Sequence, residues 1–145
     1  MNDRGIQAVI SAAAAALSVY LGAMVVPVAV LMLMMLLDYI SGMAAAWTLG
    51  TLSSRTGAKG IFRKVGYMAL IIVAMGVDYL ISMGIAAAVP GSGYNMWFGA
   101  FVAAWLIINE MISILENLGK LGVPIPDFLA KIIKHLKSST ERKNK

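Results

Sequence analysis

The feature that most constrains the fold of this chain is an apolar stretch from Ile6 to Gly50, in which Asp38 is the only charged residue. The stretch is roughly 45 residues long, whereas one helix that crosses the core of a bilayer needs about 20. The chain must therefore cross a membrane twice or fold back on itself. Composition agrees, because charged residues make up 13% of the 145 positions, against about 25% in soluble domains.

Helix-breaking residues between the apolar runs predict four hydrophobic helices. Gly22 and Pro27 are typical of a break in the first stretch. We expect helices over about residues 6–21, 24–48, 65–89 and 96–118. The first of them is only mildly apolar, so it either spans the membrane, lies in the interface or packs as a short helix. The expected fold class is an all-α integral membrane protein, with residues 1–122 as its transmembrane domain.

Basic residues gather in two regions that flank the apolar segments. Residues 51–64 contain four and no acidic residue, and the C-terminal segment contains several more. The positive-inside rule places both regions in the cytoplasm. The residues expected at the membrane surface are Arg55, Lys59, Arg63, Lys64, Lys131, Lys134 and Lys137.

The C-terminal segment, residues 123–145, begins with two closely spaced prolines. Pro124 and Pro126 each lack a backbone N–H and restrict the residue before them, so they predict a hinge. Asp127 then suits the N-cap of a short helix. Its apolar residues are Phe128, Leu129, Ile132, Ile133 and Leu136. With lysines on its other faces, this amphipathic helix is expected to lie on the inner leaflet, ahead of a basic tail.

Three of the apolar segments carry a carboxylate near the middle: Asp38, Asp78 and Glu110. A charged group at this depth costs several kcal/mol unless it faces protein or water, so each is a candidate functional residue. Counting residues from the cytoplasmic ends predicts that the three acids form one polar layer near the midplane. Buried carboxyl groups are expected to be neutral, because burial disfavours the charged form.

Small and polar residues accompany the acids at helical spacing. The further candidates for oligomer contacts or a pore lining are Ser41, Gly42, Ser82, Asn109, Ser113 and Glu116. Such faces pack helix against helix in membranes. Two interpretations stay open: hydrogen bonds that only stabilise the fold, or a surface that is buried in one assembly state and lines water in another. Glu116 is also placed to form a helix-end pair with Lys120.

The sequence offers little for catalysis. It has no cysteine and a single histidine, and it contains no phosphate-binding loop, zinc-binding helix, nucleophile elbow or dinucleotide fingerprint. We therefore expect no enzyme, no cofactor and no metal site. The basic tail lacks interleaved aromatic residues, so a membrane surface explains it better than nucleic acid does.

Three ordered blocks between about Leu31 and Leu136 resemble the phage holin family, which also includes the toxin-secretion holins of clostridia. The first runs from Asp38 to Gly42 and on to Ala46, and the second from Ser53 to Val65. The third and most specific runs from Glu110 to Pro126 and reads E-x-x-S-I-L-E-N-L-G-K-L-G-V-P-I-P.

This resemblance implies a small protein that accumulates in the host inner membrane, associates with itself and opens a timed lesion. An endolysin, or another protein without a signal peptide, leaves through the lesion, with no direct contact required. The alternatives are a four-span proton-coupled multidrug exporter or ion channel, and a purely structural membrane subunit. The key acid of such exporters lies in the first span, where this chain has none.

Overall fold

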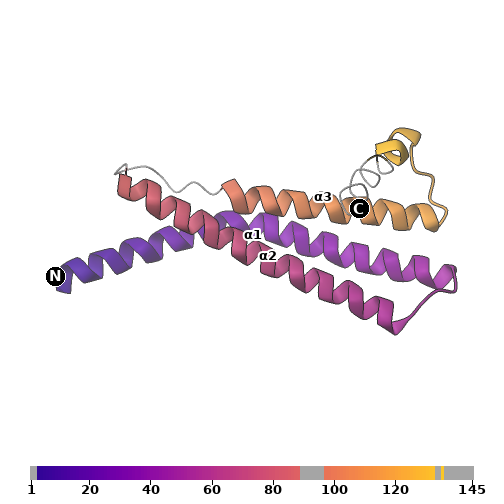
Figure 1. The fold of residues 1–145 in the computed structure, drawn as a ribbon, viewed down its shortest axis with the longest axis horizontal. Coiled ribbons are helices and arrows are strands. Elements are labelled where there is room, and N and C mark those ends of the chain that lie inside the picture. Colours follow the sequence, from indigo (N-terminus) through magenta and orange to yellow (C-terminus); the bar gives the residue numbers. More distant parts are fainter. Residues whose placement is uncertain (1–2, 89–96, 133–134, 136–145) are drawn as a thin grey trace, which may run out of the picture. The chain divides into compact units, whose positions relative to one another are not determined.

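A computed structural model describes residues 3–88, 97–132 and 135 of the chain. It contains three long helices: α1 (Asp3–Thr48), α2 (Ser54–Ala88) and α3 (Trp97–Lys120) (Figure 1). The described residues include no strand, so the all-helical prediction is confirmed. By length and composition three segments can cross a membrane: Leu21–Thr48, Ser54–Ile85 and Trp97–Lys120.

The predicted break between a first and a second helix is wrong. Gly22 and Pro27 both lie inside α1, which continues without interruption for 46 residues. Proline removes one backbone hydrogen bond, but every other polar backbone group in lipid must be satisfied within the segment, and this favours a continuous helix. The alanine-rich part of the stretch also has high helix propensity. The four predicted hydrophobic helices are thus three, and the segment 6–21 extends the first of them.

The third predicted helix begins earlier than expected. Residues 51–64 were expected to form a basic loop, whereas α2 starts at Ser54 and includes all four basic residues. Lysine and arginine have good helix propensity, so positive charge alone does not end a helix. Only residues 49–53 connect α1 to α2. Several residues expected at the membrane surface are therefore held on one rigid element.

Glycine ends both α1 and α3 with the same hydrogen-bonding motif. Gly50 and Gly122 have φ angles of 65° and 82°, in the left-handed region that suits glycine. After α3, the N–H of Val123 donates to the carbonyl of Leu118, and the N–H of Gly122 donates to that of Gly119, each at 3.1 Å. This pair of bonds is the Schellman motif. It closes α3 just before the two prolines.

Beyond α3, residues 123–126 are not helical, and residues 127–132 are. The carbonyl of Pro126 accepts the first helical hydrogen bonds, from the N–H groups of Leu129 at 2.9 Å and Ala130 at 3.2 Å. Pro126 therefore occupies the N-cap position, and Asp127, which was expected there, is the first helical residue. The greater part of the predicted amphipathic helix, with Lys134 and Lys137, lies outside the described residues. That helix and the hinge at Pro124 and Pro126 stay predictions.

The helices contribute to two compact units. The first contains residues 1–32 and 65–106, and the second contains residues 33–64 and 107–145. Leu31, Ile71 and Leu106 are almost fully buried in the first unit, beside small residues such as Ala74 and Ala103. The second unit differs: among its described residues, Asp38, Glu110 and Asn117 are buried, and the only buried apolar residues are Met35 and Ala45. Polar residues therefore form most of the core of the second unit.

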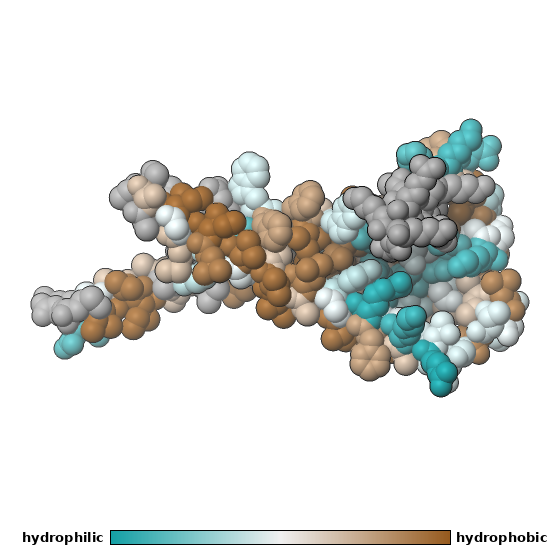
Figure 2. Space-filling view, in the orientation of Figure 1, coloured by the Kyte–Doolittle hydropathy of each residue, from teal (hydrophilic) through white to brown (hydrophobic). Residues whose placement is uncertain are grey.

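Buried and half-buried positions recur along the helices at steps of three or four residues. On α3 they include Gly99, Ala103, Leu106, Glu110 and Asn117, with half-buried Ser113 between the last two. This spacing is that of helices that pack along a narrow seam. The remaining faces are largely apolar and exposed, and hydrophobic side chains cover much of the visible surface in Figure 2. Such a surface suits lipid as the surrounding solvent.

Candidate functional site

The second unit contains a buried group of three charged side chains, one from each helix. The Lys64 ammonium on α2 lies 2.8 Å from Oδ2 of Asp38 on α1, and it also forms a salt bridge with Oε2 of Glu110 on α3. The exposed fractions of the three side chains are 13% for Lys64, 7% for Asp38 and 2% for Glu110. We call these three residues the charged triad.

A side-chain amide extends the triad on α3. Nδ2 of Asn117 lies 3.2 Å from Oδ1 of Asp38 and 3.3 Å from Oγ of Ser41. The Ser41 hydroxyl in turn donates to the Asp38 carbonyl at 3.1 Å. Gly42 makes room for this arrangement, because a Cβ atom at its position would lie 3.3 Å from the Asn117 amide nitrogen. The small residue thus allows α1 and α3 to approach closely.

The polar groups of this core are satisfied. In the described part of the chain, no buried side-chain nitrogen or oxygen lacks a hydrogen-bond partner. The triad nevertheless holds two acidic groups and one ammonium, so Lys64 can balance the charge of only one of them. Burying charges carries a large desolvation cost, which only close pairing and further hydrogen bonds offset. The arrangement is therefore stable only while α1, α2 and α3 keep their positions around Lys64.

Asp78 lies in the first unit and has a different role. Its carboxylate accepts hydrogen bonds from the backbone N–H groups of Phe98 at 3.0 Å and of Gly99 at 2.7 Å. These N–H groups belong to the first turn of α3 and have no partner within the helix. Asp78 on α2 thus supplies an N-cap from a different helix, with its charge at the positive end of the helix dipole.

The remaining polar candidates on α2 and α3 differ in how far they are buried. Ser82 is buried one turn after Asp78, while Asn109, Ser113 and Glu116 are half-buried on α3. The structure joins Asp38 and Glu110 through one lysine, but it assigns Asp78 to the start of α3. That the three acids lie at one depth near the midplane stays a prediction. Their roles in assembly or in lining a pore stay predictions.

The basic residues divide into two kinds. Arg55, Lys59, Arg63 and Lys131 are exposed, as expected for residues at a membrane surface. Lys64 is not, because its ammonium is enclosed by two carboxylates. A long lysine side chain can bury its methylene groups while its charge reaches a polar partner. The sequence prediction grouped Lys64 with a loop, since it placed the helix start at Val65.

The sequence contains a signal for both residues that the prediction missed. Lys64 lies two heptads before Asp78 on α2, and Asn117 lies one heptad after Glu110 on α3. Residues seven apart share a helix face. Extending the face of each acid by whole heptads would therefore have brought Lys64 and Asn117 into the buried set.

The site offers charge pairing and close helix packing. Among the described residues, no group of three or more histidine, cysteine, aspartate or glutamate side chains is placed to hold a metal ion. The hydrogen bonds of the triad and of Asn117 connect helices that are distant in sequence. Such a network can hold a membrane protein in one arrangement of its helices, or release it when the helices separate.

Comparisons with known proteins agree with this picture of a helical membrane protein. The chain is 34% identical over 123 residues to an uncharacterised protein of Clostridium perfringens, covering 84% of this chain and 83% of that protein. It is also 34% identical over 130 residues to an uncharacterised protein of Halalkalibacterium halodurans, covering 89% and 91%. A probable holin of Bacillus phage phi105 is 28% identical over 108 residues, covering 74% and 72%. No solved structure matches the chain.

The family assignment comes from a match to most of the chain. The family model described as the bacteriophage holin family matches residues 15–138. This region includes all three segments that can cross a membrane, the charged triad and the Asp78 cap. The resemblance found in the sequence blocks is thereby confirmed: the chain belongs to the bacteriophage holin family.

Proposed function

We propose that this protein associates with itself in the inner membrane of a bacterial host and opens a timed lesion. An endolysin, or another protein without a signal peptide, then leaves the cytoplasm through that lesion. The observation that carries the proposal is the polar core of the second unit, found in a chain of the holin family. No direct contact with the released protein is needed.

The outer surface and the core of the second unit support this function together. Large side chains such as Val26, Ile72 and Phe101 are about two-thirds exposed, at 67%, 67% and 66%. They suit contact with lipid or with apolar faces of other copies. The buried faces carry Asp38, Glu110 and their partners, which are the groups suited to line water. In lipid, a chain with this division is stable while its polar faces are buried. The same faces can line water once the helices rearrange.

The proposed mechanism is a rearrangement of helix faces. At low density each protomer keeps the charged triad buried. At a critical density, or when the membrane potential is lost, protomers exchange contacts within one copy for contacts between copies. The faces of Asp38, Asp78 and Glu110 then line water, and the desolvation cost of the charged groups is relieved.

The proposed orientation follows from the basic residues. The start of α2 and the chain beyond α3 carry Arg55, Lys59, Arg63 and Lys131 on exposed positions. The positive-inside rule assigns both to the cytoplasm. With three spans, the N-terminus then lies on the opposite side of the membrane. The C-terminal basic segment lies against anionic lipid of the inner leaflet.

Induced expression in bacteria, with and without a co-expressed endolysin, tests the function. We expect abrupt loss of optical density after a fixed delay, and only when the endolysin is present. Growth without lysis at normal protein levels would contradict the proposal. Resistance to cationic drugs without lysis would support the rival exporter instead.

Amide variants of the three acids test the mechanism. Asp38→Asn, Asp78→Asn and Glu110→Gln are each expected to change the delay before lysis. Asp127→Asn is the matched control, because Asp127 is exposed and lies after the last spanning segment. Unchanged timing in all three variants at wild-type protein levels would reject the rearrangement, while leaving the holin function itself intact.

A further inference from the structure

The second unit contains a cavity of about 700 Å³ beside the charged triad. It lies among the last turns of α1, the connection 49–53, the first turns of α2 and the end of α3. This volume falls within the range of about 300–1,000 Å³ that is usual for small-molecule sites. The cavity therefore has the size of a ligand site rather than of a packing defect.

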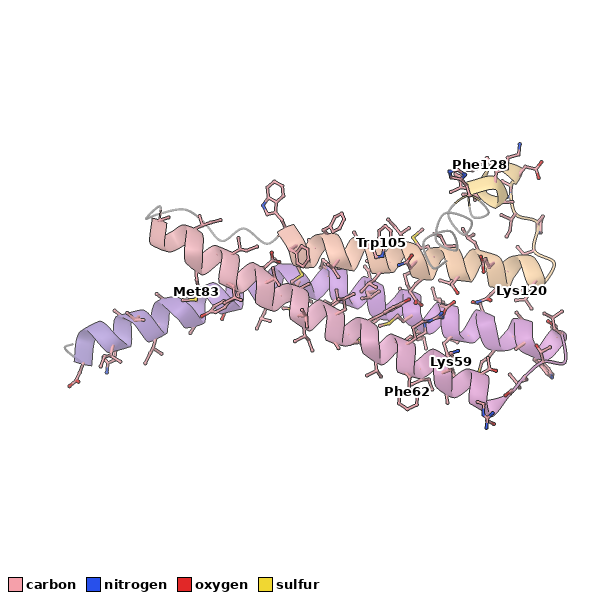
Figure 3. The ribbon with its side chains drawn as sticks, in the orientation of Figure 1. Lys59, Phe62, Met83, Trp105, Lys120 and Phe128 are labelled. Atoms are coloured by element: carbon pink, nitrogen blue, oxygen red, sulfur yellow. The ribbon has the colours of Figure 1, made fainter. Side chains whose placement is uncertain are left out.

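Positive charge lines the cavity in excess. Arg63, Lys64 and Lys120 face Asp38 as the only acidic residue of the lining. Lys64 is committed to the charged triad, whereas neither Arg63 nor Lys120 forms a salt bridge with a described residue. Two basic side chains are thus available to an anion. Figure 3 labels Lys120 at the end of α3.

Hydroxyl groups and apolar side chains complete the lining of the cavity. The hydroxyl residues Thr51, Ser53 and Ser54 lie at the connection between α1 and α2. Apolar residues of the same cavity, among them Leu49 and Ile61, are half-exposed at 57% and 50%. A ligand that matches this lining has an anionic, hydrogen-bonding end and an apolar end. In a membrane, a phospholipid has this chemistry.

We propose that the cavity binds the phosphate-bearing head group of an anionic phospholipid. Arg63 and Lys120 pair with the phosphate, the hydroxyl groups of Ser53 and Ser54 donate to its oxygens, and the acyl chains lie along the apolar residues of the lining. The ends of the spanning segments, at Thr48, Ser54 and Lys120, place the cavity where head groups lie. Basic pockets between membrane helices recognise such head groups. This inference does not depend on lesion formation.

A second copy of the chain is a less suitable occupant. A helix with its side chains is about 10–12 Å in diameter, and several turns of it exceed the volume of the cavity. A helix of this protein would also bring apolar side chains against Arg63 and Lys120. The lipid satisfies both charges without burying an unpaired group.

Native mass spectrometry of the full chain in mild detergent tests the proposal. Phosphatidylglycerol and phosphatidylcholine are added together in equal amounts, with and without millimolar sodium phosphate. We expect one phosphatidylglycerol to stay bound per chain, little phosphatidylcholine, and no displacement by phosphate. Equal retention of both lipids, displacement by free phosphate, or protein dimers in place of the lipid adduct would each overturn the proposal, and none of these readings needs a variant.

Paired variants locate the site. The double variant Arg63→Gln/Lys120→Gln is expected to bind phosphatidylglycerol about 100-fold more weakly, since each direct charged contact to the phosphate contributes roughly tenfold. The control is Arg55→Gln/Lys59→Gln, which removes the same charge from exposed positions outside the cavity. An equal loss in both double variants would assign binding to the general surface charge and refute the cavity. Circular dichroism checks that both variants keep their helicity.

Discussion

Replacing Lys64 by methionine is expected to destabilise the chain more than any other removal of a single basic residue. The change leaves Asp38 and Glu110 buried in one core with no ammonium between them. Their side chains are only 7% and 2% exposed, so water replaces little of the lost interaction. Methionine keeps most of the length and apolar volume of the lysine, which isolates the effect of the charge.

The magnitude follows from the burial of both carboxylates. Removing one partner of a buried ion pair costs about 3–5 kcal/mol, because the remaining charge is desolvated and unpaired. Lys64 serves two carboxylates, so we expect the upper half of this range. Lys59→Met removes the same charge from an exposed position on α2. Exposed charges contribute about 0–1 kcal/mol, so the two variants should differ by several kcal/mol.

Neutralising the whole triad provides the decisive comparison. The triple variant Lys64→Met/Asp38→Leu/Glu110→Met leaves no uncompensated charge in the core. Replacing a complete buried ion cluster by well-packed hydrophobic residues of similar volume is often close to neutral for stability. We therefore expect the triple variant to recover most of the stability that Lys64→Met loses.

The assay is unfolding of the purified full chain in mild detergent by titration with sodium dodecyl sulfate. Far-ultraviolet circular dichroism follows the helices, and fluorescence of Trp47, Trp97 and Trp105 follows their environments. Equal stability of Lys64→Met and Lys59→Met would refute the reasoning. So would a triple variant that is no more stable than Lys64→Met, because the loss would then come from packing and not from charge.

Three further predictions concern a cap, a close approach and a helix end. Asp78→Ala should lower the free energy of unfolding by about 1–2 kcal/mol and speed hydrogen exchange of the first backbone amides of α3. Unchanged exchange at these amides would contradict the assignment of Asp78 as the cap. Gly42→Ala should cost about 1–3 kcal/mol by overpacking, whereas Gly22→Ala, with nothing within 4 Å, should be neutral or stabilising. Gly122→Ala should lower the free energy of unfolding by about 1 kcal/mol, because the φ of Gly122 is 82°. Gly60→Ala, within helix α2, should cause no such loss. Detergent unfolding measures the glycine variants, and equal values within either glycine pair would reject the stated cause.

The sequence predicted the membrane character and the helical class because both depend on local composition. Length, apolar runs and the scarcity of charge act residue by residue, so no knowledge of packing is needed. Helix ends were predicted well where glycine adopts a left-handed conformation, as at Gly50 and Gly122. They were predicted poorly at Gly22 and Pro27, where the requirement for satisfied backbone groups in lipid outweighs local propensity.

Only part of the functional site was predictable from the sequence, because its contacts join residues that are far apart in the chain. Each acid stands out alone, because a charge inside an apolar segment is conspicuous. Its partner does not, since Lys64 is 26 residues from Asp38 and 46 from Glu110 in the chain. A lysine at the edge of an apolar run has the sequence signature of a surface residue. Only the packing of the helices in the second unit distinguishes Lys64 from Arg63 beside it.

The triad has two acidic groups and one ammonium. This composition suits a protein that must first keep its helices packed and later separate them. A neutral apolar core would stabilise the packed helices equally well, but its faces would gain nothing from water when they separate. A fully solvated charged face would not bury in the first place. Two carboxylates around one ammonium satisfy both requirements, because close pairing with Lys64 offsets their desolvation only while the three helices stay together. Once the helices part, each charge is stabilised by hydration, and the separated state is favoured by the same groups that held the packed one.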